Sequence, residues 1–302
     1  MPRIEFLPFD PNEVQKPLNL TTTLLDIYEE PAVFAHEATR TGSMTFEAKY
    51  VVQELHCNPA TIPQLRGEIQ RVGNRVTNTF IIDAENPDGQ PPHTIGHLKG
   101  VKLSPANLGV GAIYSAIGYD RPYDLIETNG MICKSPGQPE EELVADVTFT
   151  EDQDGRRIVE NPTVRINGRE HINGTHWVFV PSRSSGGIYL PQYRQFEIAP
   201  QMAGAGLELL VGPLLGRGRA AIYDGTGALK FFPELLEPGE EVRGQVTLYD
   251  LSNAPYGGLL GQFDIKLFKE EMEIAELIDV ALGFYPEPRI MEFIRTALGG
   301  AS

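Results

Sequence analysis

The stretch "EVRGQVTLYD" at residues 241–250 alternates between apolar and polar side chains, with Val242, Val246 and Leu248 on one side. A second stretch, "GQFDIKLF" at 261–268, has the same period of two. Such alternation is typical of antiparallel strands that place one face on a core and the other in water. These two segments therefore predict a protein built from half-buried strands.

Alternation of this kind continues from about residue 44 to residue 268, with Asn-Gly and Asp-Gly turn signals between the segments. The sequence therefore predicts a mainly β protein, either a large antiparallel β-barrel or a strongly curved sheet with C-terminal helices. Closure or helical cover is expected because bare strand edges invite association. Two packed β lobes are the alternative, with a boundary near the Ser/Gly-rich residues 181–187.

Helical periodicity is found near the C-terminus. The segment "KEEMEIAELIDVAL" places four apolar residues on one stripe: Met272, Ala275, Ile278 and Leu282. We expect an N-terminal arm at 1–43, an antiparallel β body at 44–268 and C-terminal helices at 269–302. The similarity between "LRGEIQR" (65–71) and "VRGQVTL" (242–248) leaves an internal duplication open.

Charge and composition exclude several classes of partner. The chain of 302 residues carries 41 acidic and 25 basic side chains, a net charge of −16, which repels phosphate backbones and anionic lipids. We expect neither nucleic acid nor membrane as a partner. The N-terminus has no signal-type apolar segment and no run is long enough to span a bilayer, so a cytoplasmic location is expected.

The six histidines and two cysteines give no metal signature. His93 and His97 are four residues apart, which on a strand separates their rings by about 13 Å, too far to share an ion. The glycine-rich segments lack the spacing of a phosphate-binding loop. The sequence therefore predicts no metal and no cofactor.

The segment "NGREHINGTHWVFV" (167–180) concentrates ionisable groups and the single tryptophan. A glutamate beside histidine or arginine can act as a general acid or base when burial sets its pKa. On a strand, Arg169 and His171 share a face while Glu170 lies on the other, so the groups cannot all enter one pocket. The segment is either part of a binding site or a hairpin with an Asn-Gly turn at each end.

Three patches resemble the acetoacetate decarboxylase family: "ENPTVRINGREHING" (160–174), "GTGALKFFPELLEP" (225–238) and "GAIYSAIGYDRPYDLI" (111–126), the last resembling a Gly-x-Tyr strand. The resemblance implies a barrel-like β fold around a small-molecule cavity, with Arg169 and Glu170 near it. The family's Schiff-base lysine is missing, because its place reads "HINGTH" and no lysine occurs between residues 134 and 230. A covalent amine mechanism is therefore not expected.

The favoured hypothesis is binding of a small, largely apolar organic molecule in a β-barrel cavity. If the protein is an enzyme, we expect cofactor-independent acid-base catalysis of the isomerase, cyclase or lyase type. The candidate catalytic residues are Glu170, His171 and Arg169, and the candidate ligand-binding residues are His176, Tyr114, Tyr119 and Trp177. The alternatives are an assembly protein that forms a defined oligomer, such as a shell or phage-type component, and a metal-dependent hydrolase.

Overall fold

The computed structural model describes residues 5–6, 44–52, 67–82, 105–134, 140–182, 190, 195–196, 198–200, 202–204, 219–232, 234–254 and 258–286. These residues form one antiparallel sheet of thirteen strands. The strands are β1 (Glu5–Phe6), β2 (Met44–Val51), β3 (Glu68–Val72), β4 (Arg75–Ile81), β5 (Tyr123–Cys133), β6 (Glu142–Glu151), β7 (Arg157–Glu160), β8 (Thr163–Ile166), β9 (Arg169–Pro181), β10 (Arg219–Phe231), β11 (Glu241–Ala254), β12 (Gly258–Lys269) and β13 (Met272–Pro286). The prediction of a mainly β protein is confirmed.

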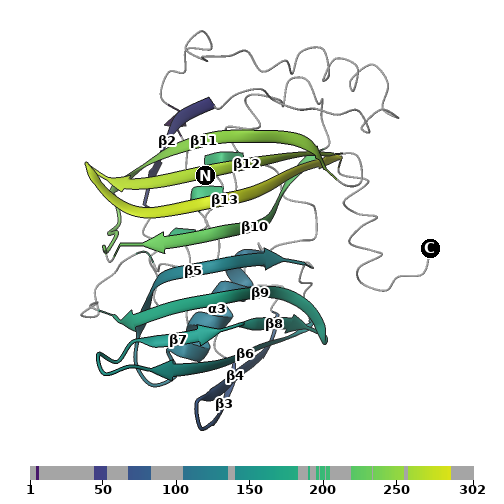
Figure 1. Ribbon diagram of the computed structural model, residues 1–302, viewed down its shortest axis with the longest axis vertical. Coiled ribbons are helices and arrows are strands. Elements are labelled where there is room, and N and C mark those ends of the chain that lie inside the picture. The colour runs from purple at the N-terminus through teal and green to yellow at the C-terminus, as the bar shows by residue number, and fades with distance from the viewer. Residues whose placement is uncertain are drawn as a thin grey trace, which may run out of the picture.

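The sheet runs in the order β1-β2-β11-β12-β13-β10-β5-β9-β7-β6-β4-β3, and β8 pairs with β6 and β9. Helix α3 (Pro105–Ile117) contacts β4, β5, β6, β8 and β9. One helix can contact so many strands only where the sheet curves around it, and Figure 1 shows α3 behind the lower strands. Within the described residues the path of strands is open, with β1 and β3 at its ends, so a closed barrel is not observed.

The sheet divides into two units that meet where β5 pairs with β10. The first unit has the order β3-β4-β6-β7-β9-β5 around α3. The second has the order β1-β2-β11-β12-β13-β10, with a helical segment that includes Gln195, Phe196 and Met202. Strands β10, β11, β12 and β13 of the second unit begin at residues 219, 241, 258 and 272. The equivalent strands β5, β6, β7 and β9 of the first unit begin at 123, 142, 157 and 169, so each equivalent pair is separated by a nearly constant number of residues. The topology is therefore duplicated.

The short sequence echo noted above does not mark this duplication. Residues 65–71 extend into β3, whereas residues 242–248 lie in β11. In the order from edge to junction, β3 corresponds to β1, and β11 corresponds to β6. The equivalence lies in the positions of strands and bulges rather than in matching residue types.

The four strands around the junction of the two units break the alternation of buried and exposed residues at the same level of the sheet. Two consecutive residues that are not buried occur in each of β5, β9, β10 and β13, at 129–130, 175–176, 227–228 and 278–279. Buried residues resume on the helix side after each pair. Gly130 and Asp279 have φ values of 59° and 57°, the left-handed backbone found in bulges. Bulges bend a strand and increase its twist, which helps the sheet wrap around its helices.

The predicted C-terminal helix at 269–302 is wrong over residues 272–286, which form strand β13. The break in alternation explains the error. Ala275 and Leu277 are buried before it, and Val280 and Leu282 are buried after it. Spacings of two, three and two residues resemble the stripe of an amphipathic helix more than a regular strand. Residues 287–302 lie outside the described residues.

Helix α3 was not predicted, and the reason is its surroundings. Its side chains at Val110, Ala112, Ile113, Ala116 and Ile117 are all at most 1% exposed. A helix enclosed by a sheet has no polar face, so it carries little amphipathic signal. Residues 111–117, which resembled a Gly-x-Tyr strand, lie in this helix.

The two Asn-Gly dipeptides of 167–180 have different roles. Asn167 and Gly168 have φ values of 47° and 77° and connect β8 to β9, so the first predicted hairpin turn is confirmed. Gly174 lies inside β9, so the second predicted turn is wrong. Apart from β1, the N-terminal arm lies outside the described residues, as does most of the proposed boundary at 181–187.

Candidate binding site

Two buried polar side chains face each other across β5 and β9 without a hydrogen-bond partner. Thr128 and Trp177 are register partners on these strands. Thr128 is 1% exposed and Trp177 is fully buried. Neither Thr128 Oγ1 nor Trp177 Nε1 makes a hydrogen bond. Register partners on one face have Cβ atoms about 5 Å apart, so the two side chains are neighbours on the inner face of the sheet.

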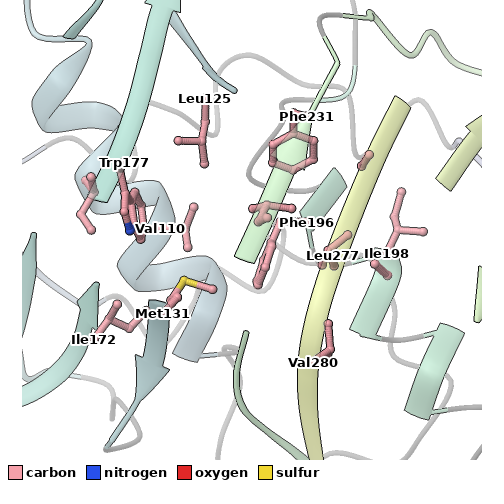
Figure 2. Packing of buried hydrophobic residues seen from close by; sticks show 14 of the residues in the cluster. Val110, Leu125, Met131, Ile172, Trp177, Phe196, Ile198, Phe231, Leu277 and Val280 are labelled. Carbon is pink, nitrogen blue, oxygen red and sulfur yellow. The ribbon is translucent and has the colours of Figure 1, made fainter. Parts of the chain in front are cut away.

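The surroundings of this pair are apolar. Figure 2 shows Trp177 close to Val110 of α3, with Leu125, Met131 and Ile172 around the same helix. All of these side chains are at most 1% exposed. Such an environment strengthens any hydrogen bond made inside it, because water does not compete.

An aromatic cluster extends from the same pair toward the middle of α3. The rings of Trp177 and Phe179 have centroids 6.3 Å apart, and Tyr114 of α3 meets Phe179 edge-on at 5.7 Å. The backbone N–H of Leu125 donates a hydrogen bond of 3.3 Å to Tyr114 Oη. Tyr114 is therefore held between β5 and β9, with its hydroxyl at the sheet.

Two glycines allow the close packing around Trp177. A Cβ atom at Gly174 would lie 2.3 Å from Trp177 Nε1, so only glycine lets the indole approach this strand. A Cβ atom at Gly109 would lie 2.2 Å from Ile172 Cδ1, so glycine also brings α3 onto β9. The contact at Gly174 fixes the position of the indole N–H.

Chemically, Thr128 and Trp177 supply hydrogen-bond donors and no charge. An indole N–H can only donate, whereas a hydroxyl can donate and accept. A carbonyl oxygen has two lone pairs and can accept from both groups at once. The pair therefore offers uncharged donors to an acceptor in otherwise apolar surroundings.

The predicted catalytic residues lie at the opposite end of β9 from Phe179. Arg169 Nη2 donates a 2.5 Å hydrogen bond to Glu141. Glu170 forms an ion pair of 2.9 Å with Lys134 and accepts a hydrogen bond from Asn173. The hydrogen bond from Lys134 lowers the pKa of Glu170, so its carboxyl group is held ionised.

The remaining predicted residues are spread over several surroundings. His171 is fully buried, and its backbone oxygen accepts a hydrogen bond from the Lys134 N–H. His176 is register partner of Asn129 at the break in alternation, and its Nδ1 lies 2.8 Å from Glu160. Of the predicted ligand-binding residues, only Tyr114 and Trp177 lie in the aromatic cluster.

Tyr119 belongs to a different polar centre, formed around Arg157 at the C-terminal end of α3. The Arg157 guanidinium is 4.8 Å from the Tyr119 ring, donates to Ile117 O at 2.5 Å and pairs with Asp120 at 2.7 Å and Glu151 at 2.9 Å. Burial alone would lower the pKa of Arg157, but these hydrogen bonds raise it above its ordinary value. The guanidinium donates to Glu151, Ile117 O and Asp120, so Arg157 ties the end of α3 to the sheet.

Sequence reasoning missed Thr128 and Arg157. Thr128 precedes an Asn-Gly dipeptide that resembles a turn, and nothing nearby indicates that its partner is residue 177. Among the described residues, no three His, Cys, Asp or Glu side chains come close enough to hold a metal ion. In the same part of the chain, no helix is long and apolar enough to cross a membrane.

Comparison with known proteins identifies similar structures but no family. No family model matches the sequence, and no curated protein matches it. The tesB protein of Mycobacterium avium subspecies paratuberculosis is similar over 76% of this chain and 100% of its own, with 10% identity and a TM-score of 0.47. The dehydratase domain of PpsC from Mycobacterium tuberculosis covers 73% of this chain and 98% of its own, with 11% identity and a TM-score of 0.40.

A third similar structure is the dehydratase domain from the CurJ module of the curacin polyketide synthase. The similarity covers 74% of this chain and 98% of that domain, with 8% identity and a TM-score of 0.43. Structural likeness at this level does not extend to substrate or activity. The function of this chain has to be argued from its own residues.

Proposed function

We propose that the protein binds a small, largely apolar organic molecule whose single polar group is a hydrogen-bond acceptor such as a carbonyl. One observation carries the proposal: Thr128 Oγ1 and Trp177 Nε1 are buried, paired in register and unpartnered in an apolar interior. Leaving a buried donor unsatisfied costs about 1–3 kcal/mol. A ligand that accepts from both groups recovers this free energy, whereas a pure hydrocarbon does not.

We infer in addition that each unit is of the hotdog type, in which a curved antiparallel sheet wraps around one central helix. The support is the contact of α3 with β4, β5, β6, β8 and β9, together with the repeat of the same strand order around the helical residues near Phe196. In such an arrangement the helix and the inner face of the sheet enclose the apolar interior. The ligand then lies between α3 and the strands β5 and β9.

Catalysis is a separate step of the proposal. Glu170, His171 and Arg169 belong to the same strand as Trp177, and we retain them as candidates for cofactor-independent acid-base chemistry of the lyase or isomerase type. Their support is their ionisable chemistry on the strand that carries Trp177, although they lie near its start, six to eight residues before Trp177. No cofactor is included in the proposal.

The test compares two ligands of matched shape, octyl methyl ketone and decane, by displacement of an environment-sensitive fluorescent ketone probe. Thr128→Val and Trp177→Phe each remove one donor. Each variant is expected to bind the ketone about tenfold more weakly and to bind decane unchanged. Thr175→Val is the control, because Thr175 is exposed on the same strand and donates to Asn129 O.

Two results would contradict the proposal. Absence of ketone binding by the unaltered protein would exclude this ligand class. Equal weakening of both ligands in the two variants would show that the changes disturb packing rather than remove a hydrogen bond to the ligand.

A further inference from the structure

The geometry points to one ligand site among the described residues, in the first unit, because the side chain of Tyr223 occupies the corresponding position of the second unit. This inference rests on the proposed function and adds the stoichiometry of binding and the residue that sets it. It follows from comparing two equivalent buried threonines. The one in the second unit has a hydrogen-bond partner, and the one in the first unit has none.

The equivalent residues are fixed by bulges in the two central strands. In β5 the register with β9 shifts between Leu125 and Glu127, and in β10 the register with β13 shifts between Tyr223 and Gly225. Each shift leaves one extra residue on the strand that follows the helix. When the two bulges are aligned, Thr128 of the first unit is equivalent to Thr226 of the second.

The same alignment makes Leu125 and Tyr223 equivalent, since each immediately precedes its bulge. Thr226 is 4% exposed, so both equivalent threonines are buried. The breaks in alternation at 175–176 and 278–279 likewise make Trp177 equivalent to Val280. The second unit therefore keeps the threonine but has no indole N–H at this level.

Tyr223 satisfies the threonine of the second unit. Its hydroxyl is hydrogen-bonded to Thr226 Oγ1, and its ring packs edge-on against Phe196 of the helical segment with centroids 5.5 Å apart. The side chain thus supplies both an apolar body and a polar partner, as the proposed ligand does in the first unit. Leu125, at the equivalent position, has no polar atom, and Thr128 is left without a partner.

The experiment counts bound octyl methyl ketone by native mass spectrometry at saturating ligand. The unaltered protein is expected to hold one molecule. Tyr223→Leu, which copies the first unit, is expected to hold two, with the second bound more weakly because Val280 offers no donor. The reciprocal change Leu125→Tyr places a phenol beside Thr128 and is expected to reduce the count to none.

Different failures separate this inference from the proposed function. Two molecules on the unaltered protein would overturn the single-site inference and leave the proposed function intact. No molecule on the unaltered protein would overturn both. A count of one for Tyr223→Leu would overturn the role of Tyr223.

A second variant controls for loss of folding in Tyr223→Leu. Tyr223→Phe keeps the ring and removes only the hydroxyl, so it should retain the native charge-state distribution while leaving Thr226 unpartnered. It is expected to keep a count of one, because the ring still fills the position. A second bound molecule in Tyr223→Phe would contradict the conclusion that the ring itself excludes the ligand.

Discussion

The two units attach their helices to similar sheets by different interactions. In the first unit, Asn78 Nδ2 donates to Ala112 O of α3, and Arg157 donates to Ile117 O at its end. In the described part of the second unit, the helical segment meets the sheet through apolar contacts: Met202 lies against Gly244, and Phe196 against Tyr223. Directional hydrogen bonds fix a helix along its axis, whereas apolar packing mainly fixes its distance from the sheet. A duplicated scaffold thus keeps its shape while its helix contacts diverge.

The largest expected effect comes from removing the charged contact at the end of α3. Arg157→Met retains the length and apolar stem of the side chain but leaves Asp120, Glu151 and Ile117 O without their donor. We expect the free energy of unfolding to fall by about 3 kcal/mol. Denaturant unfolding measures this loss, and hydrogen exchange should show it concentrated in α3. A loss below about 1 kcal/mol would contradict the conclusion that polar contacts anchor the helix of the first unit.

Removing the second polar contact should have a smaller effect. Asn78 is fully buried, and its Oδ1 also accepts a hydrogen bond from the Gly67 N–H. Asn78→Ala therefore loses two hydrogen bonds and is expected to destabilise the protein by about 2 kcal/mol. Thr77→Ala, on the neighbouring and partly exposed position, is the control and should change stability by less than about 0.5 kcal/mol.

The stability of the second unit should instead depend on side-chain volume between its helical segment and the sheet. A Cβ atom at Gly244 would lie 2.1 Å from Met202 Sδ, so Gly244→Ala forces the methionine to move. We expect a loss of about 1 kcal/mol, since overpacking usually costs somewhat more and alanine favours the strand relative to glycine. The loss should disappear when Met202→Ala is already present. Additive effects in this double-mutant cycle would show that the two residues do not interact.

Acidification should weaken the first unit selectively. Burial raises the pKa of Asp120, but the hydrogen bond and charge of Arg157 lower it by more, so its pKa lies below the ordinary value. A lowered pKa contributes stability above about pH 4, which is lost as the pH falls through the folded-state value. Asp120→Asn should lack this part of the acid dependence. An unchanged pH profile of unfolding in this variant would exclude the contribution.

The smallest effect on stability is expected at Glu170. Its ion pair with Lys134 is more than a third exposed, so Glu170→Gln should change stability by less than about 0.5 kcal/mol. The same variant tests the predicted acid-base role. Exchange of protons beside the carbonyl of octyl methyl ketone in deuterated water, followed by NMR, should slow about a hundredfold if Glu170 is the base. An unchanged rate would assign Glu170 to the surface alone.

The sequence predicted what depends on local alternation and missed what depends on enclosure or register. Strands such as β6, β11 and β12 follow a period of two and were identified. Helix α3 is buried on all sides, so no polar face revealed it. Strand β13 was taken for a helix because its break between Leu277 and Val280 changes the period of burial.

The candidate site was predictable only in part for the same reason. Trp177 and Tyr114 are large aromatic residues that lie near ionisable residues in the sequence, which made them candidates. Thr128 gained its significance only from pairing with Trp177 across two strands. Register between strands distant in sequence depends on the whole sheet, and no local pattern encodes it.

Strand β2 lies near the start of the chain but completes the second unit by pairing with β11. On the ribosome, Met44–Val51 is therefore synthesised early and can pair with β11 only after residues 241–254 have emerged. At ordinary translation rates of about 5–20 residues per second, this delay is on the order of ten to forty seconds. During that time the first unit can fold, while β2 has no β11 to pair with and is accessible to chaperones or to a neighbouring nascent chain.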